Sequence, residues 1–492
     1  MSTEILPLPA VPATAAIPPK KDFADWFSPM LVKELRQGLR ARGFVSTFIL
    51  LQVVLAVTVI IGLLTGAEGI DPRAATGFFW FFVGLPLLLV VPMMALNSLS
   101  GEMKAQTLEL IFLTRLTAWR IVVGKWLALV AQSVLFVCAI LPYAVLRYFI
   151  GGINLVEELT TLAWMLAASA LFTGITTGLS PYSSRLVRGI LVFVLIMGLQ
   201  GSVPVLFFSG SMMFRASGPS VGLAVQVALI GLSVVLVLLA FEAGAGKIAP
   251  PAENHASRKR LLGLVLLGGA ALGSWLAPGE AEFIIAAALA VAVLVCAGAL
   301  CEPSRSIPSI FAPFAKRGFA GRAVGRILYP GWSSGLLFTL VILGGFGLLF
   351  WKLDLFSNET AIVGSVALCG ALFFPAALIH AFVRDETKAF GIFIAVQALF
   401  IAVGVICVTL KSTLNWQTEW IASSIPTAAL ALVLTDSLKE LKWHWEAYLL
   451  LCSLTTGLSL HYLLYRAIGP WRKTREMEQE SLRIPTPDGP LA

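Results

Sequence analysis

Long apolar runs without a charged side chain are the feature that most constrains the fold of this chain. About 12 such runs contain no Asp, Glu, Lys or Arg, and each has roughly the 20 residues that a helix needs to cross the hydrocarbon core of a bilayer. The sequence therefore predicts an all-α, polytopic membrane helix bundle. The predicted spans are 44–65, 77–96, 126–146, 159–179, 189–208, 219–241, 261–277, 283–300, 332–351, 361–383, 389–410 and 447–465.

A thirteenth apolar run, 420–435, is short and contains Pro426. It fits a re-entrant or interfacial piece better than a span, but a span stays an alternative. With twelve spans and a cytoplasmic N-terminus, most of the 35 Lys and Arg residues fall on the cytoplasmic side. Because basic residues concentrate in cytoplasmic loops, the charge distribution mildly favours twelve spans.

Composition excludes a soluble protein. Only 13% of the 492 residues are charged and 58% are hydrophobic, which leaves too few ionisable side chains for a surface that faces water. The net charge of +8 then indicates membrane orientation and not a nucleic-acid partner. We expect a multi-pass protein of the cell (inner or plasma) membrane, with its N-terminus in the cytoplasm and no bound nucleic acid.

The segment 28–43 is amphipathic but too short to span a membrane. Ser28 is a suitable N-cap, Pro29 suits the first helical position, and Gly43 can end the helix. Leucines at a spacing of four lie on one face and basic residues on another, which predicts a helix in the cytoplasmic interface. An ordinary solvated helical start is the alternative. The leucines are Leu31, Leu35 and Leu39, and the basic residues are Lys33, Arg36 and Arg40.

A second short helix is predicted over 101–118, between the second and third spans. Glu102, Gln106 and Glu109 share one face of it, while leucine and phenylalanine side chains occupy another. Lys125 follows at the start of the third span, where we expect its ammonium to extend toward lipid headgroups.

These features resemble the permease subunits of ABC-2-type transporters. Such permeases have a basic amphipathic helix before the first span, then a loop that reads roughly E-x-x-x-G-T-x-E-x-L-x-x-x-P, and then I-V-x-G-K. Two positions depart from this pattern, because Gln106 replaces a glycine and Arg115 a proline. The resemblance covers about residues 28–243. The matching positions are Glu102, Thr107, Glu109, Leu110 or Ile111, Thr114, Ile121, Val122, Gly124 and Lys125.

The resemblance implies a six-span permease core that works as a dimer with a cytoplasmic ABC ATPase subunit. It also implies that the loop is a coupling helix, with Glu102, Thr107, Glu109 and Thr114 as candidates for contact with the ATPase. A helix that merely anchors the third span is the alternative. An ATP-driven exporter is the function implied, and a largely apolar route suits a hydrophobic or lipid-like substrate.

No catalytic, cofactor or metal site is expected in the chain. A P-loop would need G-x-x-x-x-G-K-[ST], whereas Gly124-Lys125 is followed by Trp126, so a separate subunit would have to hydrolyse ATP. The four histidines form no H-E-x-x-H motif, and the six cysteines form no C-x-x-C motif. Because the predicted span cores carry no charge, a secondary carrier is disfavoured. A polytopic assembly or anchoring protein remains the main alternative to the permease, and the chain is not expected to be an enzyme.

The predicted organisation has seven parts. We expect the basic cluster Arg258-Lys259-Arg260, in the linker of the fourth part, to meet anionic lipid. The parts are a flexible cytoplasmic tail (1–27), the interfacial helix (28–43), the six-span core (44–243), a linker with two spans (244–300), a basic cytoplasmic segment (301–331), an accessory span bundle (332–465) and a cytoplasmic tail (466–492).

Overall fold

The computed structural model describes ten stretches of the chain, and all regular secondary structure in them is helical. Ten helical segments within these stretches are long and apolar enough to cross a membrane, so the chain is a multi-pass membrane protein. The described residues are 29–67, 72–104, 117–150, 154–182, 223–250, 253–304, 307–354, 359–414, 424–434 and 445–483.

The ten spans coincide with ten of the predicted ones. The predicted span 189–208 lies outside the described residues, and 447–465 falls within a helix that is not among the ten, so the count of twelve is not confirmed. The ten are Arg42–Leu64, Thr76–Met103, Ala118–Phe149, Leu155–Tyr182, Val227–Ile248, Ala256–Leu276, Pro278–Leu300, Trp332–Lys352, Ala361–Phe382 and Glu386–Cys407.

The first bundle begins with the short helix α1 and contains the first four spans. The second of these spans is interrupted by a π-helical turn, η1, which accommodates Pro86 and its missing N–H. The helices are α1 (Pro29–Leu39), α2 (Arg42–Ala67), α3 (Pro72–Gly84), η1 (Leu85–Val90), α4 (Val91–Lys104), α6 (Ala118–Ile150), α7 (Leu155–Leu179) and the 3₁₀ turn η2 (Ser180–Tyr182).

The second bundle follows helix α10 (Leu223–Ile248), which contacts helices of both bundles. It contains the largest buried apolar cluster among the described residues. Its helices are α11 (Ala256–Leu276), η3 (Pro278–Glu280), α12 (Ala281–Leu300), α13 (Pro308–Ala315), α14 (Gly318–Leu328), α15 (Trp332–Lys352), α16 (Glu359–Phe382), η5 (Glu386–Lys388), α17 (Ala389–Leu414), α19 (Pro426–Leu434) and α20 (Trp445–Arg483).

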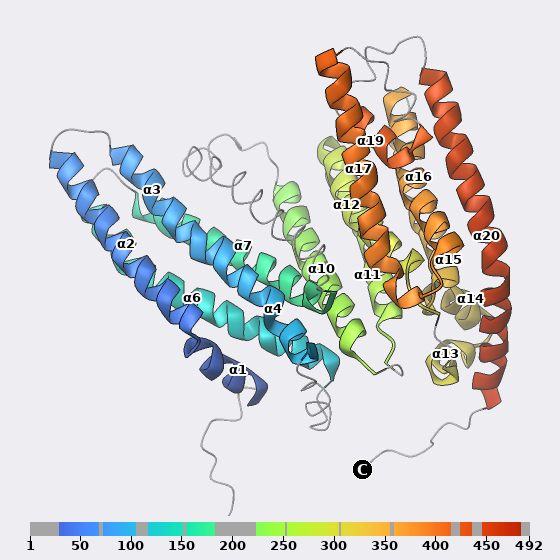
Figure 1. The fold of residues 1–492 in the computed structure, drawn as a ribbon, viewed down its shortest axis with the longest axis horizontal. Helices are drawn as coiled ribbons and strands as arrows, with labels where there is room; N and C mark the ends of the chain where they lie inside the picture. The colour runs from blue at the N-terminus through green and yellow to red at the C-terminus, as the bar shows by residue number, and fades with distance from the viewer. Residues whose placement is uncertain are drawn as a thin grey trace, which may run out of the picture.

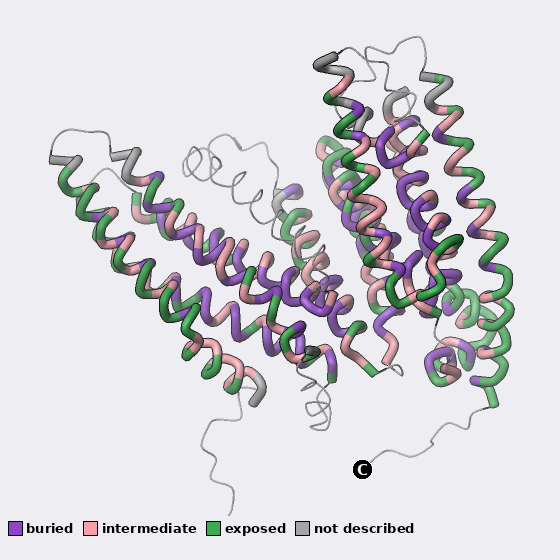
Figure 2. Tube along the Cα trace, viewed as in Figure 1, coloured by how far each residue is buried: buried purple, intermediate pink, exposed green. Residues whose placement is uncertain are grey.

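The two bundles meet at the end of the molecule where α1 lies, which we call the α1 end (Figure 1). There Tyr182, just after α7, contacts Phe390 at the start of α17 with ring centroids 5.5 Å apart. Toward the opposite end, which we call the far end, the bundles diverge in Figure 1. Many large apolar side chains of α2 are exposed. Figure 2 shows exposed residues along most of this helix, and an exposed apolar surface suits contact with lipid.

Close helix packing joins α10 to α7. A Cβ atom at Gly178 would collide with the backbone of Ala240, and one at Gly244 would collide with the carbonyl group of Gly178. Gly174 and Gly178, like Ala240 and Gly244, are four residues apart and therefore line one helix face. Small residues at this spacing let membrane helices approach closely, so α10 is held tightly against the first bundle.

The described part of the ambiguous run 420–435 contains one short helix, α19 (Pro426–Leu434). This helix has nine residues and extends about 13 Å, which is too short to span a bilayer. It packs against α16, α17 and α20.

Helix α20 has 39 residues, or about 58 Å, so it extends well beyond the hydrocarbon thickness and packs against α13 at the α1 end.

Candidate functional site

The short helix α1 lies against the first bundle at the base of α6. Lys33, Arg36 and Arg40 are exposed, whereas Leu35 and Leu39 are half-buried, as the amphipathic pattern predicts. A Cβ atom at Gly38 would collide with the side-chain amide of the buried Gln132 on α6. Glycine at this position therefore lets α1 lie directly on α6.

A buried lysine joins α1 to two spans. The Lys125 ammonium lies 3.2 Å from Glu34 Oε2 on α1 and 2.9 Å from Glu102 Oε1 near the end of α4. The Lys125 side chain is only 4% exposed, and the two carboxylates are 17% and 18% exposed. In place of the expected extension toward headgroups, the ammonium is enclosed by two anionic partners, which compensate for its loss of hydration.

In the sequence, Glu102 and Lys125 lie before and after segment 105–116, which contains most of the predicted coupling helix. Helix α4 ends at Lys104, two residues after Glu102, and α6 begins at Ala118, seven residues before Lys125. The remaining predicted contact residues, Thr107, Glu109 and Thr114, lie outside the described residues. Glu102 and Lys125 were predicted from the sequence, whereas Glu34, the second partner of Lys125, was not.

Further polar contacts fix the same helix ends. The Ser180 hydroxyl donates to the carbonyl group of Leu96 at 2.8 Å, and it accepts the amides of Leu99 and Ser100 at 3.2 Å, so it connects η2 to α4. On α6, the indole of Trp126 donates to Ala170 O at 2.9 Å and contacts the Phe241 ring of α10 at 5.3 Å. The ends of α4, α6, α7 and α10 therefore form one connected unit around Lys125.

A second charged cluster links α10 to the second bundle. His255, 6% exposed, lies with Nδ1 2.6 Å from Glu242 Oε2 and with Nε2 3.0 Å from Glu253 Oε2. Arg258 Nη1 approaches the other oxygen of Glu242 at 3.6 Å. Because both ring nitrogens face carboxylates, the imidazole can donate to both only when it is doubly protonated.

The neighbouring Arg260 is buried. The prediction that it meets anionic lipid is therefore wrong. Its guanidinium pairs with Glu302 at 2.8 Å and donates to the carbonyl groups of Ile327, Tyr329 and Gly331. Lys259 also pairs with Glu302, at 3.0 Å. Burial opposes ionisation of Glu302, but the two cations outweigh it and hold the pKa of this carboxyl below its ordinary value.

A third buried ion pair lies at the far end. Arg147 near the end of α6 binds both oxygens of Glu158 at the start of α7, at 3.2 and 3.0 Å. It also donates to Thr76 Oγ1 at 2.8 Å and lies over the Phe79 ring at 4.1 Å. This group ties α3, α6 and α7 together at the end opposite Lys125.

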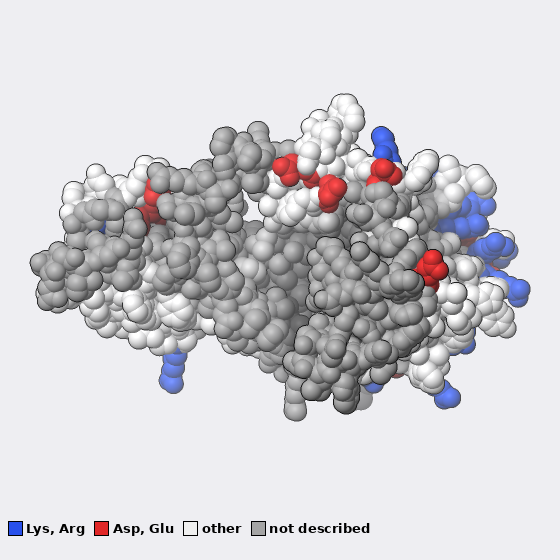
Figure 3. All heavy atoms as spheres, turned by 90° about the horizontal axis from the view of Figure 1, so that it is seen from above, with Lys and Arg blue, Asp and Glu red and all other residues white. Residues whose placement is uncertain are grey.

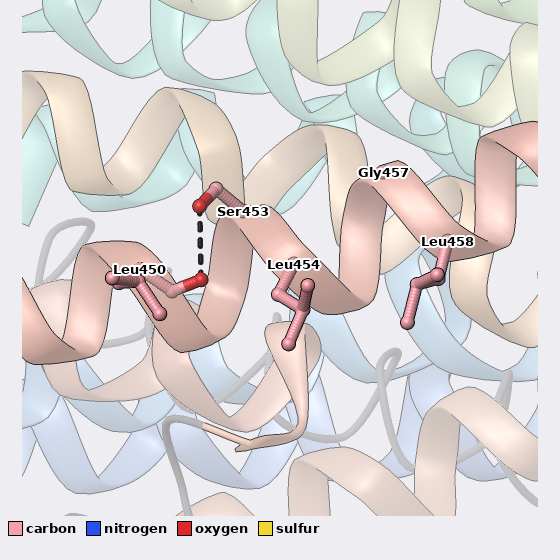
Figure 4. Close-up of a pocket in the computed structure, with 5 residues that line it drawn as sticks. All are labelled: Leu450, Ser453, Leu454, Gly457 and Leu458. Carbon is pink, nitrogen blue, oxygen red and sulfur yellow. Dashed lines mark hydrogen bonds between the residues drawn. The ribbon is translucent and has the colours of Figure 1, made fainter.

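A shallow groove on α20 offers little polar chemistry. It has a volume of about 330 Å³ and is lined by Leu450, Ser453, Leu454, Gly457 and Leu458 (Figure 4). Its hydroxyl, that of Ser453, donates to Leu450 O at 2.9 Å. The lining suits a hydrocarbon chain. Among the described residues, no group of three or more His, Cys, Asp and Glu side chains could hold a metal ion.

Comparisons of the chain with protein-family models, with curated proteins and with solved structures found no match. Function therefore has to be inferred from the chemistry of these sites.

Proposed function

We propose that this chain is the membrane-spanning subunit of an ATP-driven exporter, coupled to a separate ATPase at the α1 end. The observation that carries the proposal is the position of Lys125. Its ion pairs join α1 to the end of α4 and the start of α6. Helices α4 and α6 are the ones on either side of segment 105–116. That segment contains Thr107, Glu109 and Thr114, which match the coupling helix of ABC-2-type permeases.

The proposed mechanism is mechanical. A force applied to segment 105–116 acts on α4 and α6 together, because Lys125 holds both helix ends and α1. Tight packing of α7 on α10 then passes the displacement toward the second bundle. Packed helices respond to such forces by rigid-body movement, so ATP hydrolysis in a partner can change the arrangement of the spans.

Charge supports the placement of the ATPase at the α1 end. Lys33, Arg36 and Arg40 are exposed there, as are Arg317 and Arg322 at the start of α14. An excess of basic residues marks the cytoplasmic side of a membrane protein, where an ATPase would have ATP. A hydrophobic or lipid-like substrate fits the proposal, because a route through the predominantly apolar spans would suit it.

The test is purification of the chain in mild detergent with the protein encoded next to it. We expect an ATPase to be recovered, and we expect Glu102→Ala with Glu109→Ala to lower its activity in the complex. Glu157→Ala with Glu282→Ala is the matched control, because these two exposed carboxylates lie at the far end. Glu109→Ala alone leaves the Lys125 ion pairs intact and separates loss of coupling from loss of stability.

Two outcomes would contradict the proposal. Recovery of no ATPase, with transport unaffected by charge reversal in 101–118, would favour an assembly or anchoring protein. Transport that collapses with the pH gradient while ATP stays high would favour a proton-coupled carrier.

A further inference from the structure

Helix α14 has an apolar face that no described part of the chain covers. Phe319 is 87% exposed and Val324 is 50% exposed, and Ala320 and Ala323 between them are also exposed. At 100° per residue these four side chains occupy an arc of about 140° on one side of the helix. Such an arc is much wider than a single exposed side chain would give.

The opposite face of α14 fixes its position at the α1 end. Gly325 and Leu328 are buried, and a Cβ atom at Gly325 would collide with the ring of Tyr329. Arg260, in the first turns of the α11 span, donates to the carbonyl groups that end α14. The α15 span begins at Trp332, four residues after α14 ends. Helix α14 therefore lies at the level where two spans begin.

Basic side chains border the apolar arc. Arg322 and Arg326 lie about 60° and 20° from Phe319 around the helix, and Arg317 precedes it. Arg326 pairs with Glu478 of α20 at 3.4 Å, whereas Arg317 and Arg322 form no ion pair with any described residue. On α20, exposed Arg472, Lys473 and Arg475 are followed by exposed Glu476 and Glu480. Figure 3, which views the molecule from the far end, shows blue side chains along the right-hand margin, the side on which α20 lies in Figure 1.

We propose that α14 lies in the plane of the membrane surface, with Phe319 and Val324 inserted among lipid chains and with Arg317 and Arg322 bound to the phosphates of anionic headgroups. A wide apolar arc beside a basic stripe is what an in-plane interfacial helix requires. Guanidinium groups match phosphate in charge and hydrogen-bonding geometry. The α1 helix presents exposed basic residues at the same end, so the two helices would contact one leaflet. The inference does not depend on coupling to an ATPase.

Photo-crosslinking of the full chain in lipid nanodiscs tests the inference. Phe319→p-benzoylphenylalanine is placed in pure phosphatidylcholine and in an equal mixture of phosphatidylcholine and phosphatidylglycerol. We expect lipid adducts in both, with phosphatidylglycerol adducts enriched at least twofold over their share of the mixture. Arg317→Gln with Arg322→Gln should remove the enrichment while lipid adducts persist.

Two control positions interpret the result. Leu454→p-benzoylphenylalanine, in the groove on α20, should form phosphatidylglycerol adducts at their share of the mixture, and Gln479→p-benzoylphenylalanine, exposed near the end of α20, should form few lipid adducts. Adducts of position 319 with a second copy or with another protein, in place of lipid, would overturn the inference. Phosphatidylglycerol adducts without enrichment at position 319 would overturn the binding of anionic headgroups.

Discussion

Removal of the Lys125 ammonium should destabilise the first bundle far more than removal of an exposed cation. Lys125→Met keeps most of the side-chain volume but removes the ammonium that lies 3.2 Å from Glu34 and 2.9 Å from Glu102. Breaking a buried ion pair from one side costs about 3–5 kcal/mol. Because both carboxylates retain some exposure to solvent, we expect about 3 kcal/mol, near the lower end of that range.

The assay is unfolding in mixed micelles, with Lys33→Met as the matched control. Lys33 lies on the same helix as Glu34, but its side chain is exposed, so its replacement should change stability by less than about 0.5 kcal/mol. Adding Glu34→Gln and Glu102→Gln to Lys125→Met should restore much of the loss, because the two carboxylates that lose the ammonium are then replaced by neutral amides. Equal effects of Lys125→Met and Lys33→Met would refute the reasoning.

Three further perturbations test other parts of the structure. Arg147→Met should cost about 3–5 kcal/mol in the same assay, and adding Glu158→Gln should recover a large part of it; no recovery would mean that the guanidinium acts mainly by packing. Gly178→Ala should cost about 1–3 kcal/mol, because its methyl group would separate α7 from α10. The control Gly231→Ala meets no neighbour within 4 Å and should be neutral or slightly stabilising. Equal effects of the two variants would contradict the close packing. The lowered pKa of Glu302 contributes stability that is present above its unfolded pKa of about 4.3 and is lost as pH falls through the folded value. Glu302→Gln should therefore reduce the loss of stability at acid pH. An unchanged loss of stability would contradict this origin.

Hydropathy predicted the helical membrane fold because apolar runs near 20 residues have few other stable structures. It placed several helix ends poorly, since some predicted spans stopped at a charge that the structure contains within a helix. Lys125, Arg147, Glu158, Glu242 and Arg260 each lie one residue outside a predicted span. All five are buried with partners on other segments. At these five positions a charge at the edge of an apolar run marks a buried ion pair, whereas Glu282 and Lys352, which also lie one residue outside predicted spans, are exposed.

The candidate site was predicted only in part, for a related reason. The spacing of Glu102 and Lys125 is local, so the motif was visible in the sequence. Glu34 is distant in sequence, and its pairing with Lys125 depends on how α1 crosses α6 at Gly38. The periodicity of a single segment carries no information about such a crossing. Similarly, the Arg258-Lys259-Arg260 cluster resembled a lipid-binding patch, and only tertiary packing places Arg260 against the end of α14.

The most direct test of the central proposal measures the rate of ATP hydrolysis in nanodiscs by the complex of this chain with the ATPase encoded next to it. We expect hydrolysis to exceed that of the isolated ATPase, and we expect Glu109→Lys in segment 105–116 to abolish the difference while the complex still unfolds like the wild type. Hydrolysis that is the same with and without this chain, or that is unaffected by Glu109→Lys, would contradict coupling at the α1 end.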